Sequence, residues 1–230
     1  MMLRIPAALV AAVCVLTGCS PVMNATVQTL REAVIGPRDA AEAQLNPAFR
    51  YLRVTVDGRV TFLALGSVDQ HPHGPVEVWV SGQREVLRLQ NGRLAGASGV
   101  TTEWRAVTLP ELPSWTAIAR AAQPLQWVRV RDVMPGYRFG VRDELVLSAI
   151  SPPQKSALQR VDAQSLSWFE ERFRSGRVAG RWTRLVGSTP ADAALPPARY
   201  AVDLRNGDGV VVYGEQCLAP ELCFTWQRWK

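Results

Sequence analysis

Histidine and recognisable catalytic motifs are both scarce in this sequence of 230 residues. The two histidines, His71 and His73, flank Pro72 and have no carboxylate or thiol close by, so they make a poor metal site and favour a plain hairpin loop. A serine triad would need one of them. The sequence also lacks the Gly-x-Ser-x-Gly elbow, the Walker loop and the dinucleotide fingerprint. We therefore expect a protein that is not an enzyme and that uses neither a metal nor another cofactor.

Lysine is almost absent, occurring only as Lys155 and Lys230, so arginine carries the positive charge. The formal net charge is +6 at pH 7. Two interpretations stay open. The arginine excess reflects the codon usage of a GC-rich genome, or it builds a basic surface that faces anionic glycans, lipid phosphates or an acidic partner. Nucleic acid is not an expected partner if the chain is exported to the periplasm, as the N-terminal sequence described next predicts.

No apolar stretch reaches the roughly 20 residues that a transmembrane helix needs. The N-terminal apolar run, residues 5–16, follows Arg4 and closes with Leu16-Thr17-Gly18-Cys19. A basic start, a short apolar run and small residues before the cut are typical of a secretory signal. The cysteine at this spacing predicts a lipoprotein signal peptide over residues 1–18. An ordinary secretory signal that happens to contain a cysteine is the alternative.

Cys19 is thus the predicted site of lipidation, where the thiol takes a diacylglycerol before cleavage. Lipoproteins of this class carry three acyl chains, and more than one chain is needed for stable anchoring. Ser20 follows where an aspartate would retain the protein at the inner membrane, so we expect an outer-membrane anchor that faces the periplasm. Residues 19–48 are predicted to form the anchor, a tether and a short helix near Thr26–Ile35, and residues 49–230 a β-rich periplasmic domain.

Cysteine is also scarce, with four in the whole chain. Cys14 leaves with the signal and Cys19 is lipidated, which leaves Cys217 and Cys223. Because the periplasm is oxidising, a disulfide between these two is the simplest prediction. Closing so short a loop stabilises by roughly 2 kcal/mol in the chain-entropy model.

From Phe49 onward the apolar pattern has the period of two that is typical of β-strands. Asp57-Gly58 and Asn91-Gly92 lie between apolar runs and predict hairpins. The strand at residues 59–68 is apolar on both faces, so we expect it to be central and buried. One short helix is predicted at residues 114–122, with Ser114 as its cap and Trp115, Ile118 and Ala119 inward. Further strands are predicted at residues 51–56, 76–80, 84–90, 93–95, 127–133, 145–150, 178–186, 199–204, 210–213 and 223–229. The predicted fold is mainly β, an antiparallel, hairpin-rich meander forming a sandwich or a barrel-like domain with a few short helices.

Acidic pairs and tryptophans are the remaining candidates for chemistry. Asp143-Glu144 and Glu170-Glu171 are adjacent in sequence, so the members of each pair point apart and do not form the facing carboxylates of a glycosidase. We interpret them as solvated surface charge. The eight tryptophans are expected to serve mainly as core. Trp79 lies on the strand face opposite its valine neighbours, and together with Arg129 and Arg131 it is a candidate glycan contact.

The order of five segments carries a family resemblance. These segments are Asn46–Val54, Phe62–Gly66, Val76–Ser81, Val86–Leu89 and Asn91–Leu94. Together with the lipobox and the helical leader, this order resembles the YjbF/GfcB family of group 4 capsule and exopolysaccharide lipoproteins, most strongly over residues 46–96. The resemblance implies an antiparallel β fold in the periplasm and a role in making or exporting a surface polysaccharide, with polysaccharide-export proteins as partners. It carries over no catalytic residue.

Three hypotheses remain for the function. A non-enzymatic accessory lipoprotein that binds an anionic glycan or an export protein predicts a basic or aromatic groove without an organised acid–base pair. A glycan lyase or hydrolase predicts two titratable groups converging in a cleft, from Glu103, Asp143, Glu144 or the histidines. An envelope assembly factor would make no glycan contact. The scarcity of catalytic motifs favours the first.

Overall fold

A computed structural model describes residues 45–174, 195–205 and 207–229. The predicted signal peptide, Cys19, the leader helix and the predicted strand at residues 178–186 lie outside these ranges. Within the described residues, no helix has the length and apolar character needed to cross a membrane.

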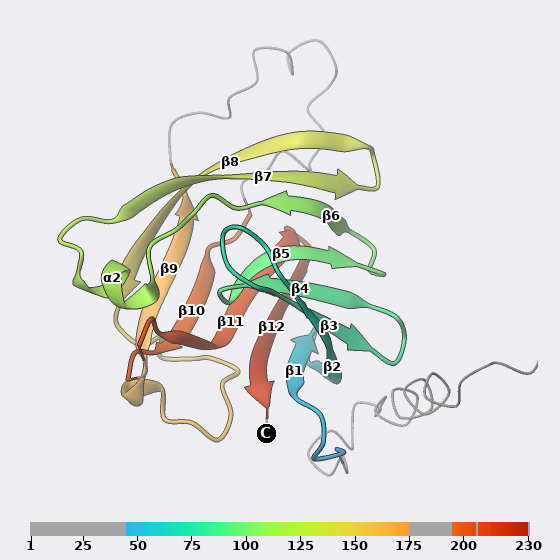
Figure 1. The fold of residues 1–230 in the computed structure, drawn as a ribbon, viewed down its shortest axis with the longest axis horizontal. Helices are drawn as coiled ribbons and strands as arrows, with labels where there is room; N and C mark the ends of the chain where they lie inside the picture. Colours follow the sequence, from blue (N-terminus) through green and yellow to red (C-terminus); the bar gives the residue numbers. More distant parts are fainter. Residues whose placement is uncertain (1–44, 175–194, 206, 230) are drawn as a thin grey trace, which may run out of the picture.

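The strands follow one another around a single closed barrel (Figure 1). They are β1 (Tyr51–Val56), β2 (Arg59–Asp69), β3 (Val76–Ser81), β4 (Val86–Gln90), β5 (Arg93–Ser98), β6 (Glu103–Thr108), β7 (Leu125–Met134), β8 (Arg138–Ile150), β9 (Ser167–Phe173), β10 (Ala198–Asp203), β11 (Val210–Ala219) and β12 (Leu222–Trp229). Every neighbouring pair is antiparallel, and β1 closes the ring by pairing with β12 from Tyr51 opposite Trp229 to Val56 opposite Phe224. The predicted antiparallel meander is confirmed, and the barrel, not the sandwich, is the form that it takes.

Two strands were missed by the sequence patterns. β6 follows no clear alternation, and it pairs with β5 in register only at Ala97 opposite Trp104. β9 contains the charged run Glu170-Glu171-Arg172, which hid its strand character. β8 also begins seven residues before its predicted start at Leu145, so its hairpin with β7 is longer than expected.

The barrel interior is filled by the inward rows of apolar side chains. Leu52, Leu63, Leu89, Tyr200 and Trp226 belong to this core. Two outer clusters cover parts of the wall. The chain at Leu45 packs over the outward side chains of β1 and β2, so the centre of β2 is buried on both faces, as predicted. The connection between β8 and β9 packs over the outer face of β9 to β11.

One end of the barrel, which we call the helix end, carries α2 (Trp115–Arg120). Ser114 caps this helix by accepting a hydrogen bond from the Ala117 amide, as predicted. Trp115 and Ile118 are buried, and the Trp115 indole N–H donates to the Asn91 carbonyl at 2.9 Å. Ala119, expected to face inward, is exposed, because it lies on the outer side of this short helix.

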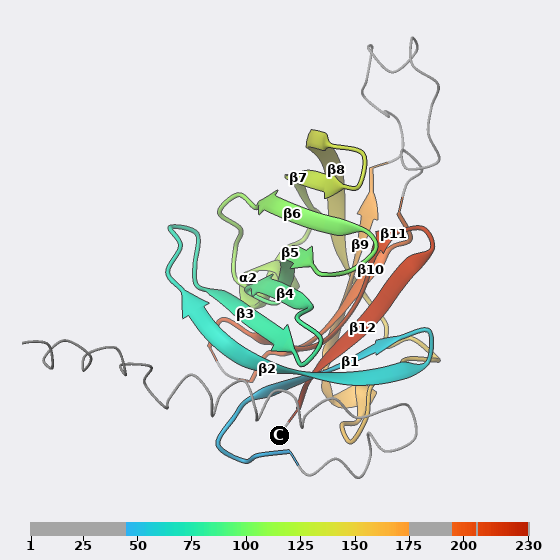
Figure 2. The ribbon, with the colours of Figure 1, turned by 90° about the vertical axis from the view of Figure 1, so that its right-hand side faces the viewer.

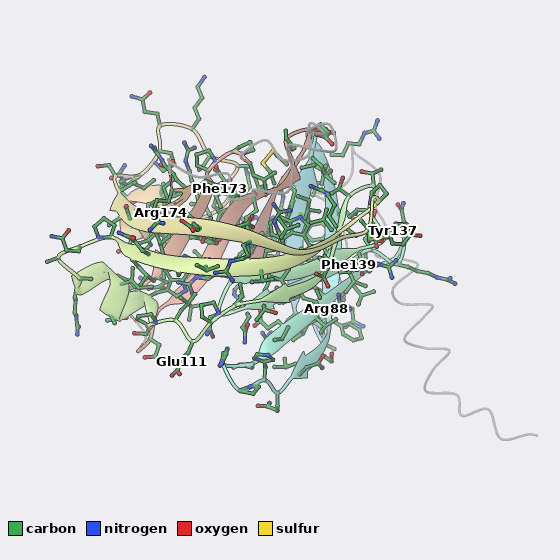
Figure 3. The ribbon with its side chains drawn as sticks, turned by 90° about the horizontal axis from the view of Figure 1, so that it is seen from above. Arg88, Glu111, Tyr137, Phe139, Phe173 and Arg174 are labelled. Carbon is green, nitrogen blue, oxygen red and sulfur yellow. A yellow bond between two sulfur atoms is a disulfide. The ribbon has the colours of Figure 1, made fainter. Side chains whose placement is uncertain are left out.

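The opposite end, which we call the hairpin end, is formed by the β1–β2, β3–β4, β5–β6, β7–β8 and β11–β12 turns. Figure 2 shows the β1–β2 and β11–β12 turns on the side away from α2. The β7–β8 hairpin extends to one side and presents Tyr137 and Phe139 to solvent, with exposed fractions of 73% and 68% (Figure 3).

Gly214 on β11 lies against the indole of Trp226, and a Cβ at this position would stand 2.6 Å from ring atoms. We expect Gly214→Ala to lower the free energy of unfolding by about 1–3 kcal/mol, because the packed core must shift to admit the methyl group. Gly66→Ala is the matched control. Its Cβ would lie 3.4 Å from Val80, an ordinary contact, so we expect a change within about 1 kcal/mol. Urea unfolding of both variants measures the difference. Equal stability of the two variants would contradict the packing described here.

Candidate functional site

Four charged side chains meet inside the barrel. Arg129 and Arg131 point inward from β7, Asp143 from β8 and Glu171 from β9, because alternate residues of a strand share one face. Arg129 Nε and Arg131 Nε donate to the same carboxylate oxygen, Asp143 Oδ2, at 2.9 and 2.7 Å. Arg131 Nη2 reaches the other oxygen at 3.1 Å, and Arg129 Nη1 lies 3.4 Å from Glu171 Oε1. All four are nearly inaccessible to solvent.

Both guanidinium groups of this ion-pair cluster stack on the indole ring of Trp104. The guanidinium carbons of Arg129 and Arg131 lie 4.5 and 4.7 Å from the centre of its indole ring. The indole N–H donates to the Leu218 carbonyl at 3.1 Å, which fixes the ring orientation. Stacking on tryptophan and bonding to a carboxylate together satisfy buried guanidinium groups.

Another charged side chain of the barrel interior, Arg93, lies toward the helix end. Its guanidinium stacks 3.9 Å from the centre of the Trp115 ring. Its Nε and Nη2 make no hydrogen bond in the part of the chain that the structure describes. Burial lowers the pKa of Arg93, with Tyr200 and Glu171 opposing that effect. Burial raises the pKa of Glu171, although Arg129 and Arg93 act to lower it.

The structure corrects the interpretation of the two acidic pairs. Asp143, Glu170 and Glu171 were interpreted as solvated charges, yet they are 2%, 5% and 3% exposed. Barrel closure turns Asp143 and Glu171 inward, and on the outer face Glu170 is covered by its arginine partners. Of the two acidic pairs, only Glu144 keeps substantial exposure.

The prediction that Trp79, Arg129 and Arg131 contact a glycan on the outer surface is also wrong. Trp79, Arg129 and Arg131 are 1%, 4% and 6% exposed, because all three point into the closed barrel. Trp79 packs in the core, and the two arginines are committed to Asp143. The alternation of residues was read correctly, but which face lies inside depends on the direction in which the sheet closes.

The buried cluster leaves no room for a substrate. A cavity of about 10 Å³ borders Trp104, Arg129, Glu171 and Gln216, and this volume suits about one water molecule. The other candidate acid, Glu103, lies at the start of β6, where it accepts hydrogen bonds from the Gly99 amide and Arg105. The Gly99 amide chiefly holds the pKa of Glu103 below its ordinary value.

The histidines occupy the β2–β3 connection, with ring centres 5.4 Å apart. His73 Nδ1 lies 2.9 Å from the Leu109 carbonyl oxygen, and His71 Nδ1 lies 3.0 Å from the Gln90 amide nitrogen. Among the described residues, no group of three histidine, cysteine or acidic side chains is placed to hold a metal ion.

A row of polar side chains crosses the outer face of the barrel. The strand registers place Thr55 of β1 opposite Thr225 of β12, Thr225 opposite Glu215 of β11, Glu215 opposite Arg199 of β10, and Arg199 opposite Glu170 of β9. We call these five residues the outer polar row. They come from distant parts of the sequence, so only the register of the closed sheet brings them together. No pattern in the sequence marked them.

Arg199 is the centre of this row. Its Nε donates to Glu170 Oε2 at 3.1 Å and its Nη1 to Glu215 Oε2 at 3.4 Å. The hydrogen bond to Glu170 is the main reason why the pKa of Arg199 is raised. Tyr213 donates its hydroxyl to Glu215 Oε1 at 2.8 Å, so this carboxylate is held from two sides.

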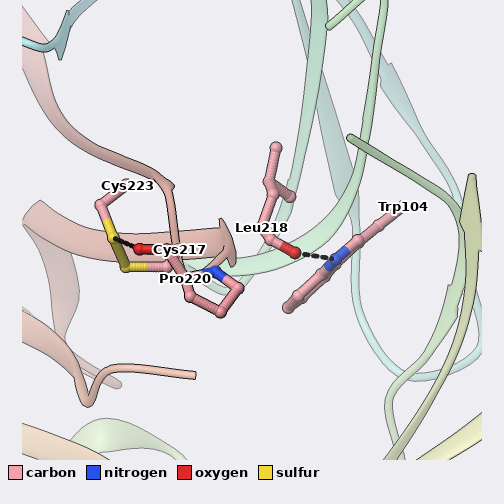
Figure 4. Close-up of a disulfide and its surroundings, with 5 residues drawn as sticks. All are labelled: Trp104, Cys217, Leu218, Pro220 and Cys223. Carbon is pink, nitrogen blue, oxygen red and sulfur yellow. Dashed lines mark hydrogen bonds between the residues drawn. A yellow bond between two sulfur atoms is a disulfide. The ribbon is translucent and has the colours of Figure 1, made fainter. Parts of the chain in front are cut away.

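The predicted disulfide between Cys217 and Cys223 is present (Figure 4). It borders the row, because each cysteine lies two residues along its strand from a member of the row, Glu215 or Thr225. The two cysteines face each other across β11 and β12, with Cα atoms 3.9 Å apart. The next residue, Leu218, is the one whose carbonyl holds Trp104. The disulfide therefore braces the same stretch of β11 that orients the floor of the buried cluster.

A groove of about 420 Å³ opens along the row, beside the disulfide. Its lining residues are Thr55, Asp57, Gly58, Pro196, Pro197, Arg199, Glu215, Gln216, Cys217, Cys223, Phe224 and Thr225. The lining combines hydroxyl groups, both signs of charge and the apolar surfaces of two prolines and the disulfide. Such a mixture can hydrogen-bond the hydroxyl groups of a sugar while covering its carbon atoms.

Comparison with known proteins identifies the fold but no family. No family model matches the chain, and no curated protein matches it. A solved structure of similar fold is described as the hypothetical lipoprotein YmcC from Escherichia coli K12. It superposes with a TM-score of 0.57 at 16% identity, covering 92% of this chain and 96% of that one. The whole barrel is therefore an architecture that another protein shares.

The buried cluster yields a test of stability. We expect Asp143→Asn to destabilise the protein by about 3–5 kcal/mol, because it removes the negative charge that two buried guanidinium groups share. Glu144→Gln changes the adjacent acid, which pairs with Arg174 on the partly exposed side, and it should cost at most about 1 kcal/mol. Chemical unfolding of both variants checks the contrast. Similar small losses in both would show that the interior ion pairs do not stabilise the barrel.

Proposed function

We propose that this protein is an outer-membrane-anchored periplasmic lipoprotein that serves as a non-enzymatic accessory factor in capsule or exopolysaccharide production or export. The signal peptide would end at residue 18 and lipid would be attached to Cys19. A segment of a polysaccharide would bind in the groove along the outer polar row, and polysaccharide-export proteins would act on the same glycan. The single observation that carries the glycan contact is this groove, because it combines hydrogen-bonding groups, a guanidinium and apolar walls.

Two further points support the pathway and the anchor. The order of segments over residues 46–96 resembles the YjbF/GfcB family, and the lipobox precedes them at the expected place. The solved structure that shares the fold is itself described as a hypothetical lipoprotein.

The way in which the charged groups are paired supports the proposed non-enzymatic role. Asp143 and Glu171 are paired with arginines in the interior. In the groove, Glu215 is held by Arg199 and Tyr213, so its carboxylate is placed to orient the Arg199 guanidinium. Such pairs favour recognition of a polar ligand over acid–base chemistry.

The test combines binding with complementation. We expect the purified surface polysaccharide of the source strain to bind the chain carrying Cys19→Ser, and Arg199→Glu to weaken binding by at least about tenfold, because it reverses the central charge of the row. Arg205→Glu is the matched control. Arg205 forms an ion pair with Asp203 outside the groove. Isothermal titration calorimetry measures both, and thermal unfolding verifies that both variants are folded.

In a deletion strain, wild-type protein and the Arg205→Glu form should restore surface polysaccharide, whereas the Arg199→Glu and Cys19→Ala forms should not. Cleavage of the polysaccharide by the purified protein would instead support a lyase or hydrolase and overturn the non-enzymatic role. Absence of glycan binding, with co-purification of export proteins, would overturn the glycan contact and favour an assembly factor.

A further inference from the structure

A second cavity lies at the hairpin end of the barrel, and the proposed glycan groove does not account for it. Its volume is about 90 Å³. Its lining residues come from six regions of the barrel: Val54, Val56, Thr61, Leu63, Glu85, Val86, Leu87, Ala97, Val100, Leu218, Leu222 and Phe224.

The cavity has a buried floor and a partly exposed rim. Side chains at the floor, such as Leu63, Leu87 and Ala97, are almost inaccessible to solvent. Side chains at the rim, such as Val86 and Val100, are half-buried. The hollow thus leads from solvent toward the barrel core, and most of its wall is apolar. Apolar surface that water can reach is stabilised when apolar matter covers it.

The chemistry of the wall selects the kind of ligand. Ten of the twelve lining residues are apolar, and the exceptions are Thr61 and Glu85. The Glu85 carboxylate already accepts a hydrogen bond from the Ser81 hydroxyl at 2.6 Å. A sugar buried here would leave most of its hydroxyl groups without partners, which is costly. A saturated carbon chain has no hydrogen bonds to lose when it is buried in the same cavity.

The size of the cavity limits the ligand further. A cavity of about 150 Å³ lined by aliphatic side chains accommodates a benzene ring, so about 90 Å³ has room for a few carbon atoms in a row. The mouths of β-barrels are common ligand sites. We propose that this cavity binds the end of an aliphatic chain, such as the acyl chain of a lipid, separately from the glycan groove.

The proposed lipid anchor makes such chains available, and this one step rests on the proposed function. Residues 20–44 number 25, and a chain of that length spans at most roughly 85 Å. The longest strands reach 10–13 residues, or roughly 35–45 Å. A tether attached beside β1 at the helix end therefore does not prevent the hairpin end from reaching the same leaflet.

The experiment titrates the chain carrying Cys19→Ser, with its valine and leucine methyl groups labelled with ¹³C, with 1-decanol and with sodium decanoate. We expect saturable shifts confined to methyl resonances of the cavity, including those of Leu63, Leu87 and Val100. Methyl groups of the exposed Val161 and Val210 should not shift. Shifts that do not saturate, or that spread over the surface, would overturn the proposal whether or not the glycan groove is functional.

Two variants test the site itself. Ala97→Leu places extra carbon in the floor, and Val100→Asp places a charge at the rim, so each should weaken decanol binding by at least about tenfold. Val210→Asp adds the same charge at an exposed valine outside the cavity and should leave binding unchanged. If Ala97→Leu does not fold, Val100→Asp decides the question. Unchanged affinity in a folded variant would overturn the proposal.

A last comparison identifies the source of the chain. The lipidated protein is incorporated into vesicles and titrated with decanol in the same way. If its cavity resonances already stand at their bound positions and decanol does not shift them, the occupying chain comes from its own anchor or from the surrounding bilayer. If decanol shifts them as in the Cys19→Ser form, the site serves a separately delivered lipid.

Discussion

Closure of the barrel by the pairing of β1 with β12 is the constraint on which the rest of the structure depends. Before this pairing, neither face of a strand is defined as the interior or the exterior one. After it, one face of each strand is interior, and the edges that the first and last strands would expose are removed. The interior must then accept whatever the inward positions carry. On β7 to β9 those positions carry Arg129, Arg131, Asp143 and Glu171.

The barrel accommodates these charges by pairing them with one another and by stacking them on Trp104. Two guanidinium groups share one carboxylate, and the indole beneath them is fixed by Leu218. A buried network of this kind is only weak evidence for high stability, because desolvation offsets much of the attraction. Its geometric effect is clearer. It links side chains of β7, β8 and β9 to one another, and the disulfide joins β11 to β12 next to the Leu218 carbonyl that accepts a hydrogen bond from Trp104.

Closure also creates the two surfaces to which we assign functions. The outer polar row exists because residues from β1, β12, β11, β10 and β9 fall into one line across the sheet. The apolar cavity exists because side chains from both ends of the sequence meet at the hairpin end. The two differ in chemistry, one rich in hydrogen-bonding groups and the other nearly devoid of them. In the function that we propose, the groove along the outer polar row would bind the polysaccharide and the apolar cavity would bind an acyl chain.

Local features were largely predictable from the sequence. The hairpin turns at Asp57-Gly58 and Asn91-Gly92, the Ser114 cap, the buried centre of β2 and the disulfide all depend on residues close together in the chain, and all are present. β6 and β9 were not predictable, since one has almost no alternation and the other carries three successive charges. The candidate glycan contacts were predicted wrongly, because Trp79, Arg129 and Arg131 lie inside the barrel.

The sequence by itself determined that the chain forms antiparallel strands joined by tight turns, because period and turn chemistry are local properties. It also determined which residues share a strand face. Only the tertiary structure decided which face lies inside, which residues stand opposite one another on neighbouring strands, and where cavities remain. These depend on the direction of closure and on registers between residues as far apart in the sequence as Tyr51 and Trp229, and no short stretch of sequence contains that information.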